Sequence, residues 1–99
     1  MEKGGFVYIM TNKSRTVLYT GVTSDLLTRV NEHRSHLHAK SFTARYHLNI
    51  LVYYEVFVFI EEAITEEKRI KGGSRASKTK LIEQRNPGWM DLYDEVASW

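Results

Sequence analysis

Cysteine is absent from this sequence. Its absence excludes disulfides, zinc sites built from thiolates and catalysis by a cysteine nucleophile. The chain also begins without the basic and then apolar leader that is typical of secreted proteins. Both absences fit a reducing compartment, and we therefore expect a cytoplasmic protein.

A long apolar segment is absent as well. The longest apolar run, ILVYYEVFVFI from Ile50 to Ile60, is too short for a membrane helix and contains Glu55, so we expect no membrane partner. The chain has neither an internal repeat nor a low-complexity tract, and 99 residues suffice for one core without metal or disulfide support. These features predict a single domain over residues 1–99.

The net charge is only +2, but the charges are unevenly distributed. The segment KRIKGGSRASKTK, from Lys68 to Lys80, contains lysine and arginine and no acid, whereas IEEAITEE before it is acidic. A local basic strip of this kind suits a polyanion such as nucleic acid. The alternative is a solvated surface of two helices with no ligand.

The sequence patterns predict an α+β fold. Strand formers indicate strands at Phe6–Met10, Thr16–Val22 and 50–59, and the third should lie at the sheet centre because it is apolar on both faces. Helical periodicity and breakers such as Gly72-Gly73 and Asn86-Pro87-Gly88 indicate four helices. They are a helix capped by Thr23 or Ser24 and ending near Ser35, Ile60–Lys71, Ala76–Gln84, and a short helix in WMDLYDEVASW.

The first two strands should form a hairpin around the polar turn TNKSR. If the turn occupies residues 12–15, Thr11 faces Thr16 and Tyr8 lies directly opposite Tyr19. Cross-strand partners share one face of a sheet, so the two phenols should be neighbours. Gly21 follows at a position where a side chain would crowd whatever lies above the strand.

Polar side chains interrupt the apolar faces of two predicted helices. In the first helix His33 lies within the apolar stripe formed by Leu26, Val30 and Leu37, and Arg29 lies at the border of this stripe. The side of the helix predicted to face solvent carries Asp25, Thr28, Glu32 and Ser35. In the second helix Glu67 lies within the stripe of Ile60, Ala63, Ile64 and Ile70. A carboxylate on an inward face is costly unless it is paired, hydrogen-bonded or bound to a metal.

Each of these side chains alone has an ordinary structural explanation, such as a salt bridge, a satisfied core histidine or sheet packing. Together they suit phosphodiester hydrolysis. One carboxylate with waters can hold Mg²⁺, an arginine matches a phosphate, and a histidine moves protons near neutral pH. A tyrosine could be the base only if nearby cations eased formation of its phenolate. A zinc site at His33, His36 and His38 is a weaker alternative, because its ligands fall mostly in a loop.

The ordered segments FVYIMTNKSRTVLYTGVTSDLLTRVNEH, YYE, AITEEKRIKGGSR and KTKLIEQRNPGWMDL resemble the GIY-YIG nuclease superfamily, and within it the small stand-alone UPF0213 group. The resemblance covers nearly the whole chain. It departs at Phe6-Val7-Tyr8, which lacks the glycine of the first motif, and at Gly72-Gly73, where related proteins often carry a tryptophan. The residues that match the functional positions of the family are Tyr8, Tyr19, Arg29, His33, Glu67 and Asn86.

The resemblance implies a three-stranded antiparallel sheet flanked by helices and an endonuclease that cleaves DNA, with a role in DNA repair or processing. Glu67 would hold Mg²⁺ or Mn²⁺, and no small-molecule cofactor is expected. Arg29 would bind a phosphate oxygen, Tyr19 would orient the attacking water, and Asn86 would fix the substrate or a loop. Tyr8 is the first choice for the general base and His33 the alternative.

The surface that tracks phosphates should be basic. We expect contributions from Lys40, Arg45, Arg75, Lys78 and Lys80. A domain of this size has little surface for reading bases, so we expect structure-selective or weakly specific binding with strong salt dependence. A non-catalytic module that binds DNA or RNA is the alternative function, because the basic strip would serve it equally well.

Overall fold

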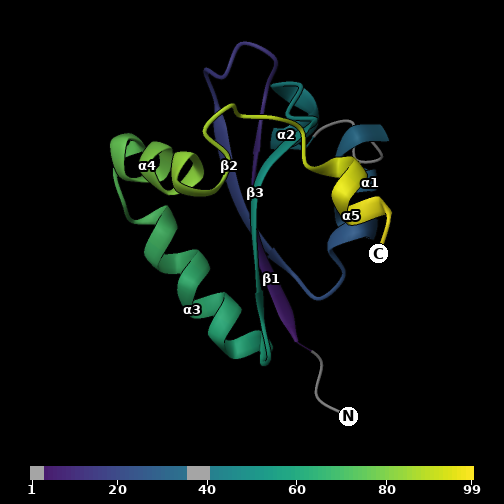
Figure 1. Ribbon diagram of the computed structural model, residues 1–99, viewed down its shortest axis with the longest axis vertical. Helices are drawn as coiled ribbons and strands as arrows, with labels where there is room; N and C mark the ends of the chain where they lie inside the picture. Colours follow the sequence, from purple (N-terminus) through teal and green to yellow (C-terminus); the bar gives the residue numbers. More distant parts are fainter. Residues whose placement is uncertain (1–3, 36–40) are drawn as a thin grey trace.

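The computed structural model describes residues 4–35 and 41–99. Within these residues, strands and helices follow one another along the chain as Figure 1 shows. They are β1 (Gly5–Thr11), β2 (Leu18–Thr23), α1 (Leu26–Ser35), α2 (Phe42–Arg45), β3 (Ile50–Phe57), α3 (Ile60–Lys71), α4 (Arg75–Arg85) and α5 (Tyr93–Ala97). Of these described helices, none is long and apolar enough to cross a membrane.

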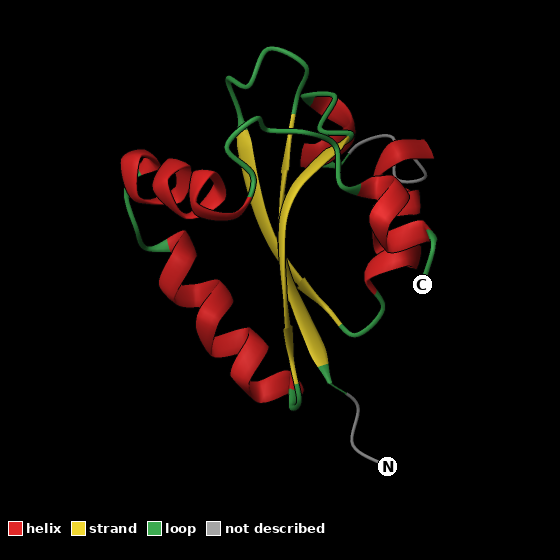
Figure 2. Ribbon diagram, viewed as in Figure 1, coloured by secondary structure: helices red, strands yellow, loops and turns green. Residues whose placement is uncertain are grey.

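The strands form one antiparallel sheet in the order β2-β1-β3. The prediction that the third strand lies at the sheet centre was therefore wrong, because β3 is an edge strand. Its residues are apolar on both faces for another reason: helices cover both faces of the sheet. In Figures 1 and 2 the sheet is seen nearly edge-on, with α3 and α4 on one side and α1 and α5 on the other.

The register of the β1–β2 hairpin also differs from the prediction. Thr11 pairs with Leu18 rather than Thr16, and Tyr8 pairs with Gly21 rather than Tyr19. This shift of two residues keeps every side chain on its predicted face, since the side-chain period of a strand is two. The two phenols are diagonal neighbours with ring centroids 6.2 Å apart.

The cause of the shift is a longer turn than predicted. The Asn12 side chain accepts hydrogen bonds from the backbone N–H groups of Thr16 at 2.8 Å and Val17 at 3.2 Å. Arg15 adopts a left-handed conformation with φ 59°. These contacts hold residues 12–17 outside the ladder.

Each face of the sheet has its own hydrophobic core. Under α3 and α4 the buried residues are Val7, Ile9, Val52, Tyr53, Ala63, Ile70, Ile82 and Trp89. Under α1 and α5 they are Tyr8, Met10, Leu26, Val30, Leu48, Leu51 and Val96. Ile64, predicted to face inward, is instead exposed, because it lies at the rim of the surface that α3 buries.

Helix α1 is capped by a residue that the sequence prediction did not choose. The Asp25 carboxylate accepts a hydrogen bond from the Thr28 N–H at 3.2 Å, as a helix N-cap does. The Thr23 hydroxyl accepts instead from the Asp25 N–H at 3.1 Å. The helix therefore begins later in the chain than a cap at Thr23 or Ser24 requires.

Candidate active site

Tyr8 lies in the middle of the sheet face that α1 covers. Its side chain is 2% exposed, and its hydroxyl lies 3.0 Å from His33 Nε2. The opposite residue, Gly21, has no side chain, and a Cβ there would overlap the Tyr8 phenol. The glycine predicted to leave room above the strand therefore makes room for this ring.

A chain of hydrogen bonds continues from His33 into α2. His33 Nδ1 lies 2.8 Å from the Thr43 hydroxyl, which lies 3.1 Å from the Ser41 hydroxyl. Ser41 caps α2 by accepting a hydrogen bond from the Ala44 N–H. The sequence prediction missed Ser41 and Thr43, although a serine three residues before Ala44 is a recognisable helix-start signal.

The environment of Tyr8 favours its protonated form. Burial raises the pKa of the Tyr8 phenol, and the charge and hydrogen bond of Tyr19 raise it further, while the Arg29 guanidinium lowers it. Burial is the largest of these effects. A buried phenol with a raised pKa is a poor source of phenolate at neutral pH.

A concave pocket of about 150 Å³ opens beside this hydrogen-bond chain. It lies between β2, α1 and α2 and is lined by Tyr19, Arg29, Glu32, His33, Ser41, Phe42 and Thr43. The prediction that Glu32 faces solvent was wrong in part. Its carboxylate lies 3.5 Å from Arg29 Nε and shares the pocket wall, since α1 turns this edge toward α2. The Arg29 side chain remains nearly half exposed and accessible to a ligand.

Glu67 lies on α3, which packs on the opposite face of the sheet from Tyr8. Its side chain is 12% exposed, and its carboxylate lies 2.9 Å from Lys71 Nζ. The Lys71 ammonium lies 6.0 Å from the centroid of the Tyr19 ring. Because β2 is an edge strand, the end of α3 can approach the phenol around that edge.

Metal coordination by this chain would rest on Glu67. The described residues contain no group of three or more histidine, cysteine, aspartate or glutamate side chains that could hold an ion. One oxygen of the largely buried Glu67 carboxylate is paired with Lys71, and a single carboxylate fits Mg²⁺ or Mn²⁺ because such ions keep several waters and share substrate oxygens. His36 and His38, two of the three residues in the alternative zinc prediction, lie outside the described residues.

Asn86, predicted to contact the substrate or a nearby loop, occupies a buried position beside β3. Its amide donates to the backbone carbonyls of Val52 at 3.1 Å and Met90 at 2.8 Å and accepts from the Met90 N–H at 3.0 Å. These bonds attach the segment after α4 to the edge of β3. They support the loop-fixing role rather than direct contact with a substrate.

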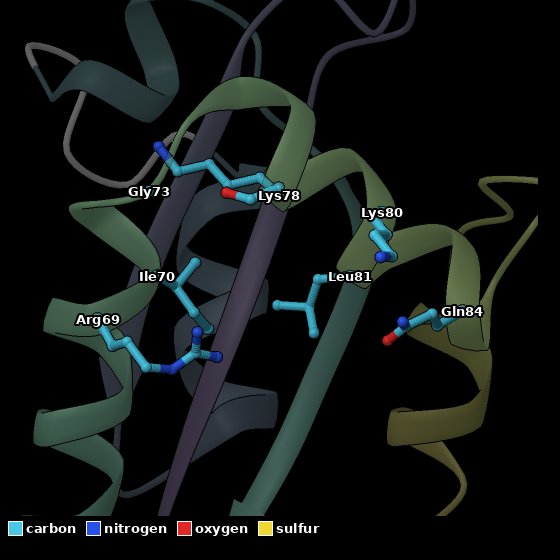
Figure 3. Close-up of a pocket in the computed structure, with 8 residues that line it drawn as sticks. Arg69, Ile70, Gly73, Lys78, Lys80, Leu81 and Gln84 are labelled. Atoms are coloured by element: carbon cyan, nitrogen blue, oxygen red, sulfur yellow. The ribbon is translucent and has the colours of Figure 1, made fainter.

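The residues predicted to track phosphates fall in different places. Arg75 donates to the backbone carbonyls of Arg15 and Thr16 and thereby holds the β1–β2 turn. Lys78 and Lys80 line a second pocket of about 270 Å³ between α3 and α4, together with Arg69 (Figure 3). This pocket lies on the opposite side of the sheet from Tyr8.

Two predicted basic residues remain. Arg45 is exposed on α2, beside the pocket that contains Tyr19 and His33. Lys40 lies outside the described residues.

Comparison with known proteins identifies the family of the chain. The family model described as the GIY-YIG catalytic domain matches residues 4–82. A UPF0213 protein of Staphylococcus haemolyticus is 39% identical over 80 residues, which cover 81% of this chain and 95% of that protein. A UPF0213 protein of Oceanobacillus iheyensis is 37% identical over 83 residues, covering 84% and 94%.

A solved structure shows the same fold. The solution NMR structure of a UPF0213 protein from Bacillus halodurans superimposes with a TM-score of 0.56 at 30% sequence identity, covering 90% of this chain and 93% of that one. The predicted α+β fold with a three-stranded antiparallel sheet is confirmed. The chain belongs to the GIY-YIG nuclease superfamily and, within it, to the UPF0213 group.

Proposed function

We propose that this protein is a divalent-metal-dependent endonuclease that hydrolyses phosphodiester bonds of DNA. The observation that carries the proposal is the hydrogen-bonded series Tyr8–His33–Thr43 beside a pocket that also exposes Arg29. Family membership supports a nuclease. The pocket offers Arg29 as a phosphate ligand and His33 as a proton acceptor. A role in DNA repair or processing and structure-selective or weakly specific cleavage belong to the same proposal.

Arg29 binds a non-bridging oxygen of the scissile phosphate. Its guanidinium is nearly half exposed at the pocket wall and presents paired donors. The bond strengthens as negative charge builds on the phosphate in the transition state. When bound at Glu67, a Mg²⁺ or Mn²⁺ ion supplies charge stabilisation of the leaving oxygen.

His33 accepts the proton of the attacking water. With Nδ1–H donating to Thr43, Nε2 carries no proton and accepts from the Tyr8 hydroxyl. Tyr19 lines the pocket with its ring centroid 6.2 Å from that of Tyr8, so it orients the water whose proton passes through the Tyr8 hydroxyl to Nε2. This relay requires no free phenolate, in agreement with the raised pKa of Tyr8.

The test is cleavage of duplex, nicked, branched and single-stranded DNA with Mg²⁺ or Mn²⁺. We expect cleavage that EDTA abolishes and that Glu67→Gln removes. Glu66→Gln is the matched control, because Glu66 lies on the same helix but pairs with Arg69 through two hydrogen bonds. Retained cleavage in Glu67→Gln would contradict the assigned metal position.

A non-catalytic nucleic-acid-binding module is the second candidate. The basic pocket between α3 and α4, with Arg69, Lys78 and Lys80, favours it because binding there needs none of the residues around His33. Salt-sensitive binding of DNA or RNA without cleavage of any substrate in the panel would favour this module over the nuclease.

A further inference from the structure

Two aromatic side chains of the α2 segment are exposed at the rim of the candidate active site. Phe42 is 48% exposed and Tyr46 is 42% exposed. Their ring centroids lie 4.7 Å apart with planes tilted by 47°. Large apolar rings that remain accessible to solvent next to a pocket are candidates for ligand contact.

The two rings are continuous with the pocket. Phe42 lines it together with Arg29 and His33. The Phe42 ring also lies 6.1 Å from the Tyr19 ring, with planes tilted by 32°. A ligand that touches the Phe42 ring can therefore extend directly into the place where the scissile phosphate is proposed to bind.

The attachment of α2 to the sheet depends on other residues. Thr43 is buried and bonds to His33, and Leu48 is fully buried and donates its N–H to the Thr43 carbonyl at 2.8 Å. Phe42 and Tyr46 face outward from this attachment. The attachment of α2 to the sheet therefore does not use these two rings, which remain available for a ligand.

The neighbouring charge indicates which ligand the rings accept. Arg45 is exposed between them in the sequence, and Arg29 is at the pocket wall. Flat rings flanked by cations are the arrangement with which proteins hold single-stranded nucleic acid, each base stacking on a ring while its phosphate meets a cation. A base within a duplex is stacked on its neighbours and cannot offer its face to a side chain.

We propose that Phe42 and Tyr46 form a base-stacking site that selects nucleic acid with an unpaired base beside the cleaved phosphate. The inference deepens the proposed function and rests on it, since it names the substrate feature that the same pocket recognises. It assigns to α2 a role in choosing single-stranded or branched substrates over perfect duplex.

The test measures stacking without catalysis. Oligonucleotides that carry 2-aminopurine at successive positions are titrated with the protein in EDTA. We expect quenching at one position of the single strand and little quenching in the matched duplex. The double substitution Phe42→Leu with Tyr46→Leu keeps apolar bulk but removes both rings, and should weaken single-strand binding about 10- to 100-fold while leaving duplex binding unchanged.

The matched control is Phe59→Leu. Phe59 is 44% exposed, like the two rings at the pocket rim, but precedes α3 at the other end of β3. The Phe59→Leu variant should show the same quenching and the same affinity for single strands as the wild type. Circular dichroism and thermal melting of each variant establish that the fold is kept.

The outcomes separate this inference from the proposed function. If the double variant keeps the quenching and the preference for single strands, the stacking site is wrong even when the protein cleaves DNA. If no substrate is cleaved but the quenching occurs and depends on the two rings, the nuclease proposal fails and the stacking site stands. Absence of quenching in the wild type would overturn the inference as well.

Discussion

The two faces of the sheet are built from the same strands but differ in chemistry. The face under α3 and α4 buries a predominantly apolar cluster that includes Val7, Ile9 and Ile82. The face under α1 and α2 also has a core, but it places a phenol, an imidazole and a threonine hydroxyl in one hydrogen-bonded series beside a pocket. The face under α3 and α4 therefore chiefly provides stability, with Glu67 on α3 as its proposed metal ligand, and the other face combines a core with reactive groups.

Within this comparison of the two faces, the largest expected effect is the loss of the proton acceptor. His33→Ala should lower the cleavage rate by about 10²- to 10⁴-fold, the usual contribution of a general base. Steady-state cleavage assays across pH measure the loss. His47→Asn is the control, because His47 is exposed and has φ 56°, a conformation that asparagine tolerates. If His33→Ala cleaves DNA at the wild-type rate, His33 is not the proton acceptor and the assignment of catalysis to the face under α1 and α2 fails.

Next in size is the loss of the phosphate ligand on the same face. Arg29→Ala should reduce kcat by about 10²- to 10³-fold, as for other donors to a transition-state oxygen. Its melting temperature should stay near wild type, since the side chain is nearly half exposed and only weakly paired with Glu32. Arg34→Ala, which removes an exposed pair with Asp91, should change the rate little. Equal rates for the two variants would refute the role of Arg29.

The apolar core of the opposite face, unlike Glu67 on α3, should respond in stability rather than in rate. Ile82→Ala removes a fully buried side chain under α4 and should cost about 2–5 kcal/mol of unfolding free energy. Chemical denaturation measures this loss. Cleavage by the folded fraction should remain close to wild type, and a fall in kcat larger than the folded fraction explains would show that the faces are coupled.

Asn86→Ala tests whether Asn86, at the edge of β3, contributes to stability alone or also contacts the substrate. Removing its buried hydrogen bonds to Val52 and Met90 should cost about 1–3 kcal/mol of stability. If Asn86 only fixes the loop after α4, the KM for DNA should not change in the folded protein. A raised KM at unchanged stability would instead support direct contact with substrate.

The smallest effect concerns the basic pocket between α3 and α4. Replacing Lys78 and Lys80 together by alanine should weaken DNA binding uniformly across sequences. The slope of log affinity against log salt should become shallower by about one for each phosphate that the protein no longer neutralises. Binding titrations at several salt concentrations measure this slope. An unchanged slope would show that this pocket lies outside the DNA path.

The candidate site was partly predictable because residue spacing alone assigns faces. The placement of Tyr8 and Tyr19 on one face survived the incorrect register, since a shift of two residues preserves sidedness. Glu32 and Ile64 were misassigned because both lie at the borders of helix faces. Spacing gives the angle of a side chain around its helix but not how far the neighbouring element extends.

The contacts that join distant segments were not predictable in the same way. Thr43 meets His33 only because Leu48 and the sheet hold α2 against α1. The position of β3 at an edge likewise depends on pairing across many residues, whereas its apolar pattern reports only that both faces are covered.

The sequence by itself determined the three strands, the helices other than α2, and the faces of side chains away from the helix borders, because these follow from local periodicity. It also carried the family resemblance. Only the tertiary structure decided the hairpin register, the hydrogen-bonded series from Tyr8 to Thr43 and the approach of Lys71, the partner of Glu67, to Tyr19 around the edge of β2. These depend on how far and at what angle separate elements pack, which no local pattern contains.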